Sequence, residues 1–208
     1  MFGRRQREAN ASRYGYTAKG TSVVLYRNKA LRAFQYFAYP QWPGALYITP
    51  STAGSRPGAL IAAAWATVMA MGRSGYVDAT RRILDAAQEI KQGVAAIDGL
   101  FIFGDPKAMV VGFGARGFDI YRLGQAMTDK GWSLNMLQHP ASAHVCVTLP
   151  VASNAKRFLA DLAAAADEVR GQKADAQGSA PVYGLAAALP SGPLVKILTM
   201  YTDIVLEA

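Results

Sequence analysis

Helix and strand patterns alternate regularly over residues 75–208, and this alternation limits the possible folds more than any other part of the sequence. A helix over about 76–97 is expected, because apolar side chains recur there at three- and four-residue steps with charged side chains opposite. Further along come strands near 100–103 and 108–113, a helix near 119–130, strands near 133–137 and 144–149, and a helix near 154–169. This order, strand-strand-helix repeated twice, predicts a small α/β domain. A polar linker over 171–181 and a closing helix near 193–205 follow.

The chain before this domain has a different character and divides into two parts. Residues 1–13 are polar and arginine-rich without a hydrophobic period, and residues 14–74 are dense in aromatic side chains, proline and glycine. Residues 21–26 are expected to form a strand, and Pro57 suits the first turn of a helix over 58–71. That helix is apolar on nearly every side, so we expect it to be buried in a core or in a subunit interface.

Composition and charge exclude several classes of function. The 208 residues are 51% hydrophobic and 17% charged, which is ample for a folded α/β body. Residues 1–13 hold four arginines against one glutamate, which accounts for +3 of the net charge of +8; the rest is spread beside acids, so nucleic-acid binding is not expected. The longest apolar run, 59–71, is shorter than the ~20 residues that span a bilayer, and no secretory signal is recognisable. The sequence therefore predicts a cytoplasmic protein without a transmembrane segment.

Three features of the second half that resemble site motifs are better explained by structure. Residues 112–117 match G-x-G-x-x-G, but dinucleotide binding also needs an acid about 20 residues later, and none is there. We expect these glycines to allow a tight turn. His139 and His144 are the only histidines, and no cysteine or acid cluster joins them, so no metal site is expected. Cys146 is the only cysteine, and its alternating strand pattern predicts a buried thiol.

Two segments of the first half have side chains that suit a phosphate group. Gly54, Ser55 and Arg56 offer backbone N–H groups, a hydroxyl and a guanidinium immediately before the expected helix. Lys19, on a short loop between aromatic side chains, offers a second cation. These residues predict phosphate binding, with ordinary loop chemistry as the alternative.

Taken in order along the chain, several segments resemble the pyridoxal-phosphate decarboxylase-like family that contains sphingosine-1-phosphate lyase. The segments are 14–20 (YGYTAKG), 42–47 (WPGALY), 53–58 (AGSRPG), 75–77 (GYV), 118–123 (FDIYRL), 130–135 (KGWSLN), 144–149 (HVCVTL) and 183–186 (YGLA). The resemblance implies an α/β fold of fold type I, with a remnant of the large cofactor-binding domain over 14–74 and the small C-terminal α/β domain over 75–208. It also implies homodimers that use pyridoxal 5'-phosphate. Their reaction is a retro-aldol cleavage of a phosphorylated long-chain amino alcohol into a fatty aldehyde and phosphoethanolamine.

The same resemblance implies roles for individual residues. Lys19 corresponds to a position near the substrate phosphate. Gly54 and Ser55 correspond to residues on the cofactor phosphate of the neighbouring subunit. Tyr47 and Tyr183 match tyrosines that line the substrate site.

Before Tyr14 the chain departs from the family. Where the family has His-Lys, this chain has Ser12 in the cofactor-binding position and Arg13 in that of the Schiff-base lysine. A guanidinium stays protonated and is a poor nucleophile, so Arg13 is not expected to bind the cofactor covalently. The cofactor-ring contacts of the family's upstream half have no counterpart in residues 1–13, which form a leader unlike the family.

Two hypotheses follow from this departure. In the first, the chain is a truncated carbon–carbon lyase that is inactive alone and works with an upstream chain that supplies the missing half. In the second, it is a non-catalytic remnant or partner subunit that binds phosphate or a full-length paralogue. The expected partners are a phosphorylated amphipathic small molecule and either a second copy, a full-length chain or an upstream chain.

Overall fold

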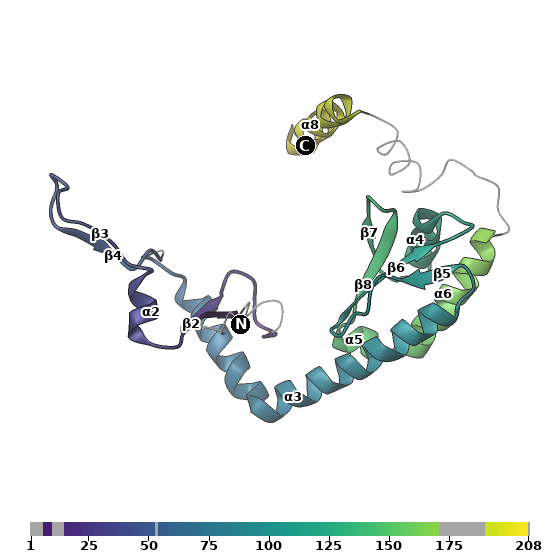
Figure 1. The fold of residues 1–208 in the computed structure, drawn as a ribbon, viewed down its shortest axis with the longest axis horizontal. Coiled ribbons are helices and arrows are strands. Elements are labelled where there is room, and N and C mark those ends of the chain that lie inside the picture. Colours follow the sequence, from purple (N-terminus) through teal and green to yellow (C-terminus); the bar gives the residue numbers. More distant parts are fainter. Residues whose placement is uncertain (1–5, 10–14, 53, 171–189, 208) are drawn as a thin grey trace. The chain divides into compact units, whose positions relative to one another are not determined.

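The structure is a computed structural model that describes residues 6–9, 15–52, 54–170 and 190–207 (Figure 1). The chain divides into two compact units, Met1–Tyr76 (unit 1) and Val77–Ala208 (unit 2). This boundary lies two residues from the one between 74 and 75 that the sequence predicts. Ser12, Arg13 and Tyr183 lie outside the described residues.

Unit 1 contains two small antiparallel strand pairs. Strand β1 (Gln6–Ala9) pairs with β2 (Val23–Tyr26), and β3 (Phe37–Tyr39) pairs with β4 (Tyr47–Thr49). The short helix α2 (Lys29–Ala33) begins after Asn28, whose side chain accepts a hydrogen bond from the Leu31 N–H. The sequence predicts β2, but it does not predict β1, α2, β3 or β4, because such short elements carry too few residues for a hydrophobic period.

Helix α3 (Gly58–Ala96) consists of two helical arms that meet at Gly72, in agreement with the two helices expected over 58–71 and 76–97. It is kinked at Gly72, where φ is 55° and ψ is −179°, a conformation that is essentially restricted to glycine. The part of α3 in unit 2 is amphipathic as predicted. Its buried positions recur at three- and four-residue steps: Ala79, Ile83, Ala86, Ala87, Ile90 and Val94.

Unit 2 is built on a four-stranded antiparallel sheet with the order β5-β6-β8-β7. The strands are β5 (Leu100–Ile102), β6 (Val110–Ala115), β7 (Asn135–Leu137) and β8 (Ser142–Cys146). The helices are α4 (Ile120–Asp129), the short α5 (Leu149–Ala152), α6 (Ala155–Arg170) and α8 (Ser191–Glu207). Apart from α5, the elements from β5 to α6 follow the predicted strand-strand-helix order.

The hydrophobic core lies between one face of this sheet and the helices α3, α4 and α6. Phe113, Leu123, Phe158 and Leu162 have no exposed surface there. Trp132 meets the Phe158 ring edge-on, with 5.2 Å between the ring centroids. By contrast, none of the residues that the structure describes in unit 1 is fully buried. The two units therefore differ sharply in how much apolar surface they remove from water.

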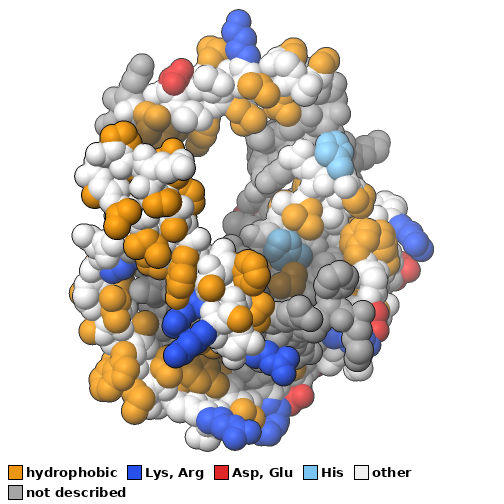
Figure 2. All heavy atoms as spheres, turned by 60° about the vertical axis from the view of Figure 1, so that its left-hand side comes forward, with side chains coloured by type: hydrophobic (Ala, Val, Ile, Leu, Met, Phe, Trp, Pro, Cys, Tyr) orange, Lys and Arg blue, Asp and Glu red, His pale blue; other side chains and the backbone are white. Residues whose placement is uncertain are grey.

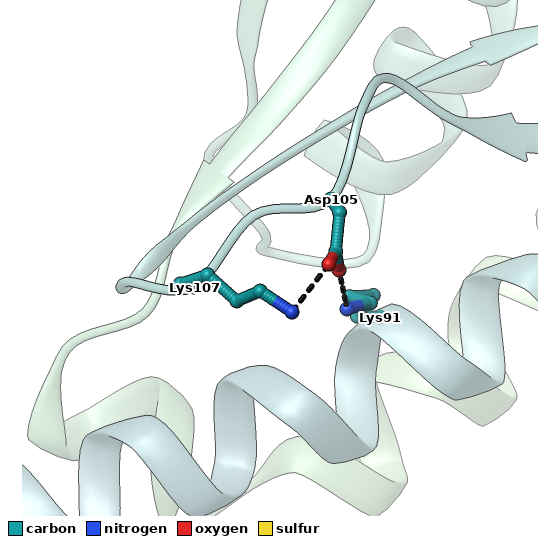
Figure 3. A network of polar contacts seen from close by, with 3 residues as sticks. All are labelled: Lys91, Asp105 and Lys107. Atoms are coloured by element: carbon teal, nitrogen blue, oxygen red, sulfur yellow. Dashed lines mark hydrogen bonds and ion pairs between the residues drawn. The ribbon is translucent and has the colours of Figure 1, made fainter.

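A small polar network joins the loop after β5 to helix α3. The Asp105 carboxylate accepts hydrogen bonds from the ammonium groups of Lys91, on α3, and Lys107 (Figure 3). These two cations lower the pKa of Asp105 from 3.8 to about 2, the hydrogen bond from Lys107 having the largest effect. Because the network is exposed, it positions the loop more than it stabilises the fold.

Two expectations for unit 2 are wrong. Cys146 is exposed at the end of β8, whereas its strand pattern predicts a buried thiol. Gly112 and Gly114 lie inside β6, whereas only Gly117, with a φ of 87°, has the turn conformation expected of these glycines. A Cβ atom on Gly114 would lie 2.6 Å from Cζ of Phe101 on the paired strand, so this glycine makes room for an aromatic ring.

Two predicted absences concern the described residues only. None of their helices combines the length and the apolar character needed to cross a bilayer. Within the same residues, no group of three or more His, Cys, Asp or Glu side chains is placed to hold a metal ion.

Candidate functional site

The structure describes four of the candidate site residues, and all four lie in unit 1: Lys19, Tyr47, Gly54 and Ser55. Within the described residues, no hydrogen bond or ion pair joins any two of them. They occupy three separate segments: a turn before β2, strand β4, and the approach to α3.

Tyr47 belongs to a cluster of aromatic rings on the β3–β4 pair. Its ring meets Phe37 at 6.3 Å and Trp42 at 5.7 Å between centroids, both edge-to-face. The connection between the strands allows this because a Cβ atom on Gly44 would lie 2.7 Å from the Trp42 ring. Tyr47 is nevertheless 43% exposed. A partly open aromatic surface with a phenolic hydroxyl suits a ligand that has both apolar and polar parts.

Gly54 and Ser55 lead directly into the N-terminus of α3. Residues 54–58 are exposed, and the first turn of the helix holds no acidic side chain. A Cβ atom on Gly54 or Gly58 would have no neighbour within 4 Å, so space is left around the backbone here. The first N–H groups of a helix lack intrahelical partners and carry a partial positive charge, which favours anions. With the Arg56 guanidinium beside them, these donors suit the phosphate predicted from the sequence.

Lys19 lies in a turn that is held against α3 at both ends. At one end the Tyr76 hydroxyl donates a hydrogen bond to the Gly15 carbonyl at 2.8 Å, and the Tyr16 and Tyr76 rings are 6.2 Å apart. At the other end, a Cβ atom on Gly20 would lie 3.1 Å from Cδ1 of Leu60. Lys19 itself is exposed. Sequence reasoning does not assign Tyr76 a role, because a tyrosine in a helix carries no signal of a contact 61 residues away.

The charged side chains of residues 15–76 all have the same sign. No Asp or Glu occurs between Glu8 and Asp78. Residues 15–76 hold six cationic side chains, all exposed: Lys19, Arg27, Lys29, Arg32, Arg56 and Arg73. Figure 2 shows Lys and Arg side chains among hydrophobic ones on the face that it presents. A surface without acidic groups attracts anions, which agrees with a phosphorylated ligand.

Large apolar side chains are exposed in the same unit. The exposed fraction is 89% for Phe34, 84% for Leu46 and 66% for Trp65. Trp65 lies on the part of α3 that was expected to be buried in a core or a subunit interface, and in this chain by itself that part is not covered. Soluble monomers rarely expose contiguous apolar patches of more than a few hundred Å². Unit 1 therefore leaves several large apolar side chains open to solvent.

The residues that this chain offers fit a phosphate group but not the covalent attachment of pyridoxal phosphate. Gly54, Ser55 and Arg56 supply neutral and charged donors for a phosphate. Arg13, which the family resemblance places at the position of the Schiff-base lysine, has a guanidinium that does not form an imine. No catalytic step through the cofactor can therefore be derived from the residues of this chain.

No family model matches the chain. Among curated proteins it is 41% identical over 193 residues to a sphingosine-1-phosphate lyase of Arabidopsis thaliana, which covers 92% of this chain and 36% of the relative. It is 42% identical over 199 residues to sphingosine-1-phosphate lyase 1 of Mus musculus, covering 94% of this chain and 35% of the relative. The chain thus spans about a third of the length of the curated relatives it matches.

Solved structures give the same picture. A sphingosine-1-phosphate lyase of Burkholderia pseudomallei matches with a TM-score of 0.73 and 34% identity, covering 95% of this chain and 42% of that one. A glutamate decarboxylase of Lactobacillus brevis matches with a TM-score of 0.66 at 17% identity, covering 82% of this chain and 42% of that one, and so shares the fold. The predicted α/β fold of fold type I, represented by part of that fold, is confirmed.

Proposed function

Since this chain is a relative of the sphingosine-1-phosphate lyases over 92–94% of its own length, we propose that it forms the phosphate-binding part of a pyridoxal-phosphate-dependent carbon–carbon lyase of their kind. The reaction is the retro-aldol cleavage of a phosphorylated long-chain amino alcohol into a fatty aldehyde and phosphoethanolamine. The observation that carries the proposal is the cationic surface of residues 15–76, which contain no acidic side chain and in which Lys19 and the Gly54–Ser55 segment are both exposed.

Each candidate residue has one task in this proposal. Lys19 binds the phosphate of the substrate, and Gly54 and Ser55 bind the phosphate of the cofactor. Tyr47 contacts the apolar chain and offers a hydroxyl beside it, and Tyr183 has the role that the family resemblance implies, a contact with the substrate. The cofactor, where it is bound, supplies the carbon–carbon bond chemistry, and the residues of this chain bind and orient the phosphates.

Turnover by this chain alone is not part of the proposal. Arg13 does not replace the lysine that bonds the cofactor, and the chain spans about a third of its relatives' length. In this proposal the amine and the contacts to the cofactor ring are supplied by polypeptide outside the 208 residues of this sequence.

Phosphoethanolamine, the expected product, is the probe that tests the phosphate site. We expect Lys19→Gln to weaken its binding to the full chain more than tenfold in isothermal titration calorimetry, because a hydrogen bond to a charged group contributes roughly 1.5–3 kcal/mol. Lys29→Gln is the matched control, since Lys29 is an exposed cation of the same unit. An equal loss in both variants would mean diffuse attraction, and no binding by the unaltered chain would refute the phosphate site.

Arg13→Lys tests whether the missing residues matter for catalysis. We expect this variant to remain inactive in aldehyde release when assayed alone with pyridoxal phosphate, because one amine does not supply the contacts to the cofactor ring. Borohydride reduction followed by peptide mass spectrometry reports whether any lysine has bonded the cofactor. Recovery of aldehyde release by Arg13→Lys alone would show that the chain is a complete catalyst.

A non-catalytic partner subunit is the second candidate function, and the exposed apolar side chains of unit 1 favour it. In this case the chain forms a homodimer or binds a full-length chain through α3 and the β3–β4 pair. We expect the sedimentation coefficient to rise with concentration and Trp65→Lys to suppress the rise. Val110→Lys is the control, because Val110 is 44% exposed but lies in unit 2. Identical sedimentation of all three proteins would remove α3 from the interface.

A further inference from the structure

The turn that carries Lys19 has its own anchor on α3. We propose that Tyr76 is a positioning residue that fixes the backbone of residues 15–20 and thereby places the Lys19 ammonium for phosphate binding. The second half of this statement rests on the proposed function of Lys19, whereas the first half concerns only the backbone of the turn.

The Tyr76 hydroxyl acts on a strained point of the chain. It donates a hydrogen bond to the Gly15 carbonyl at 2.8 Å, immediately before Tyr16, whose φ is +59°. A left-handed conformation is unfavourable for a non-glycine residue and persists only where its surroundings hold it. Tyr76 stabilises this conformation of Tyr16 through two contacts. One is the hydrogen bond to Gly15, and the other is the contact between the Tyr16 and Tyr76 rings, whose centroids are 6.2 Å apart.

The two anchors of the turn lie on opposite sides of the kink in α3. Leu60, beside Gly20, precedes Gly72, and Tyr76 follows it. The segment 15–20 is therefore attached to both arms of the kinked helix. Losing the Tyr76 anchor would release one end of the turn while the other end stays in contact with Leu60.

Anchoring the backbone matters because no side chain of residues 15–76 can fix the Lys19 side chain by charge. This stretch contains no acidic residue, so an ion pair with Lys19 is not available within it. A lysine has a flexible four-carbon stem, and its ammonium is only as well placed as the backbone that carries it. Holding a binding group in place before the ligand arrives strengthens binding by lowering the entropy lost on association.

Limited proteolysis measures the anchoring directly, without any ligand. Trypsin cleaves after Lys19 when the turn opens, and we expect Tyr76→Phe to accelerate this cleavage about fivefold, which is the effect of losing one typical hydrogen bond. The phenylalanine keeps the ring contact, so we expect α3 to stay folded in this variant. Tyr39→Phe, at an exposed tyrosine of the same unit, should leave the rate unchanged. Cleavage after the exposed Lys107 in unit 2 is the internal standard.

Phosphoethanolamine binding then tests whether the anchoring serves Lys19. We expect Tyr76→Phe to weaken binding about fivefold, and the double variant Tyr76→Phe/Lys19→Gln to bind no more weakly than Lys19→Gln alone. Multiplicative effects of the two substitutions would overturn the link between Tyr76 and Lys19, because independent sites add their free energies.

The two assays separate this inference from the proposed function. An unchanged cleavage rate after Lys19 in Tyr76→Phe overturns the anchoring, whatever the phosphate result. Faster cleavage together with no phosphoethanolamine binding by the unaltered chain supports the anchoring and overturns the phosphate site. Hydrogen exchange of the amides of residues 16–20 gives a second measure of the same opening, and it should quicken in Tyr76→Phe but not in Tyr39→Phe.

Discussion

The fold clearly alters the ionisation of Asp105. Its pKa is about 2 instead of 3.8, first because of the hydrogen bond from Lys107 and then because of that from Lys91. Since the folded-state value lies below the unfolded value, this contribution to stability is present above about pH 4 and is lost as the pH falls toward 2. We predict that Lys107→Gln raises the pKa of Asp105 toward 3.8 and that Lys91→Gln raises it less, as measured by NMR titration of the carboxyl carbon.

Salt provides the control for this titration. The Asp105 side chain is 59% exposed, so raising the ionic strength should screen both cations and shrink the displacement in the unaltered protein. A pKa that stays at about 2 in Lys107→Gln would contradict the assignment of Lys107 as the main cause.

Substitutions of Gly99 and Gly104 can be compared to distinguish the cost of backbone strain from the cost of a steric clash. Both have a positive φ, 77° and 64° respectively. A Cβ atom on Gly99 would lie 2.9 Å from the Arg116 carbonyl oxygen, whereas one on Gly104 would have no neighbour within 4 Å. We predict that Gly104→Ala lowers the free energy of unfolding by about 1 kcal/mol and Gly99→Ala by about 2–4 kcal/mol in urea denaturation. Equal losses would mean that the backbone near Arg116 moves aside at little cost.

At the scale of the elements, long amphipathic helices were predictable and short strands were not. The second half of α3, α4 and α6 each carry enough apolar positions at helical spacing to define a buried face. The three-residue strands β3 and β4 carry no such period, and their pairing depends on the aromatic contacts around Tyr47. The exposure of Cys146 was missed for a different reason. An alternating pattern shows which face of a strand is buried. It does not show at which residue the helices that cover this face end, and Cys146 lies at the end of its strand.

The chemistry of the candidate site is still a prediction from the sequence, whereas the contacts that hold its residues in place are visible only in the structure. Lys19, Gly54 and Ser55 stand out in the sequence because cations, glycines and hydroxyls are the groups that bind phosphate. Tyr76 does not stand out, since its role depends on a tertiary contact with Gly15 that no local pattern encodes.

The kink in α3 gives the prediction that belongs to this scale. Gly72 has a conformation that alanine avoids, whereas Gly75 is an ordinary helical glycine whose added Cβ would meet Met71 at 3.7 Å. We predict that Gly72→Ala destabilises the kinked helix by about 1–3 kcal/mol and that Gly75→Ala stabilises the helix by up to about 1 kcal/mol. Thermal denaturation followed by circular dichroism distinguishes the two signs. A stabilising Gly72→Ala with increased helix content would mean that the helix straightens there readily.

At the scale of the whole molecule, the buried core belongs to unit 2 alone among the described residues. We predict that residues 77–170 fold by themselves and melt at the midpoint of the full chain, while the amides of residues 15–76 exchange faster than those of the core of unit 2. Leu162→Ala should lower the free energy of unfolding by about 2–5 kcal/mol equally in both proteins. An unfolded fragment would show instead that unit 1 contributes to the stability of unit 2.

The acid-free stretch between Glu8 and Asp78 also determines how unit 1 responds to its solvent. Residues 9–77 contain no carboxylate side chain, no histidine and no cysteine, the groups that usually change charge between pH 3 and 9. The charge of this stretch is therefore constant across that range, whereas a phosphate monoester loses its second proton near pH 6. If phosphates bind here, the affinity will change around neutral pH because the charge of the ligand changes. The positive charge of residues 9–77 will stay the same over this range.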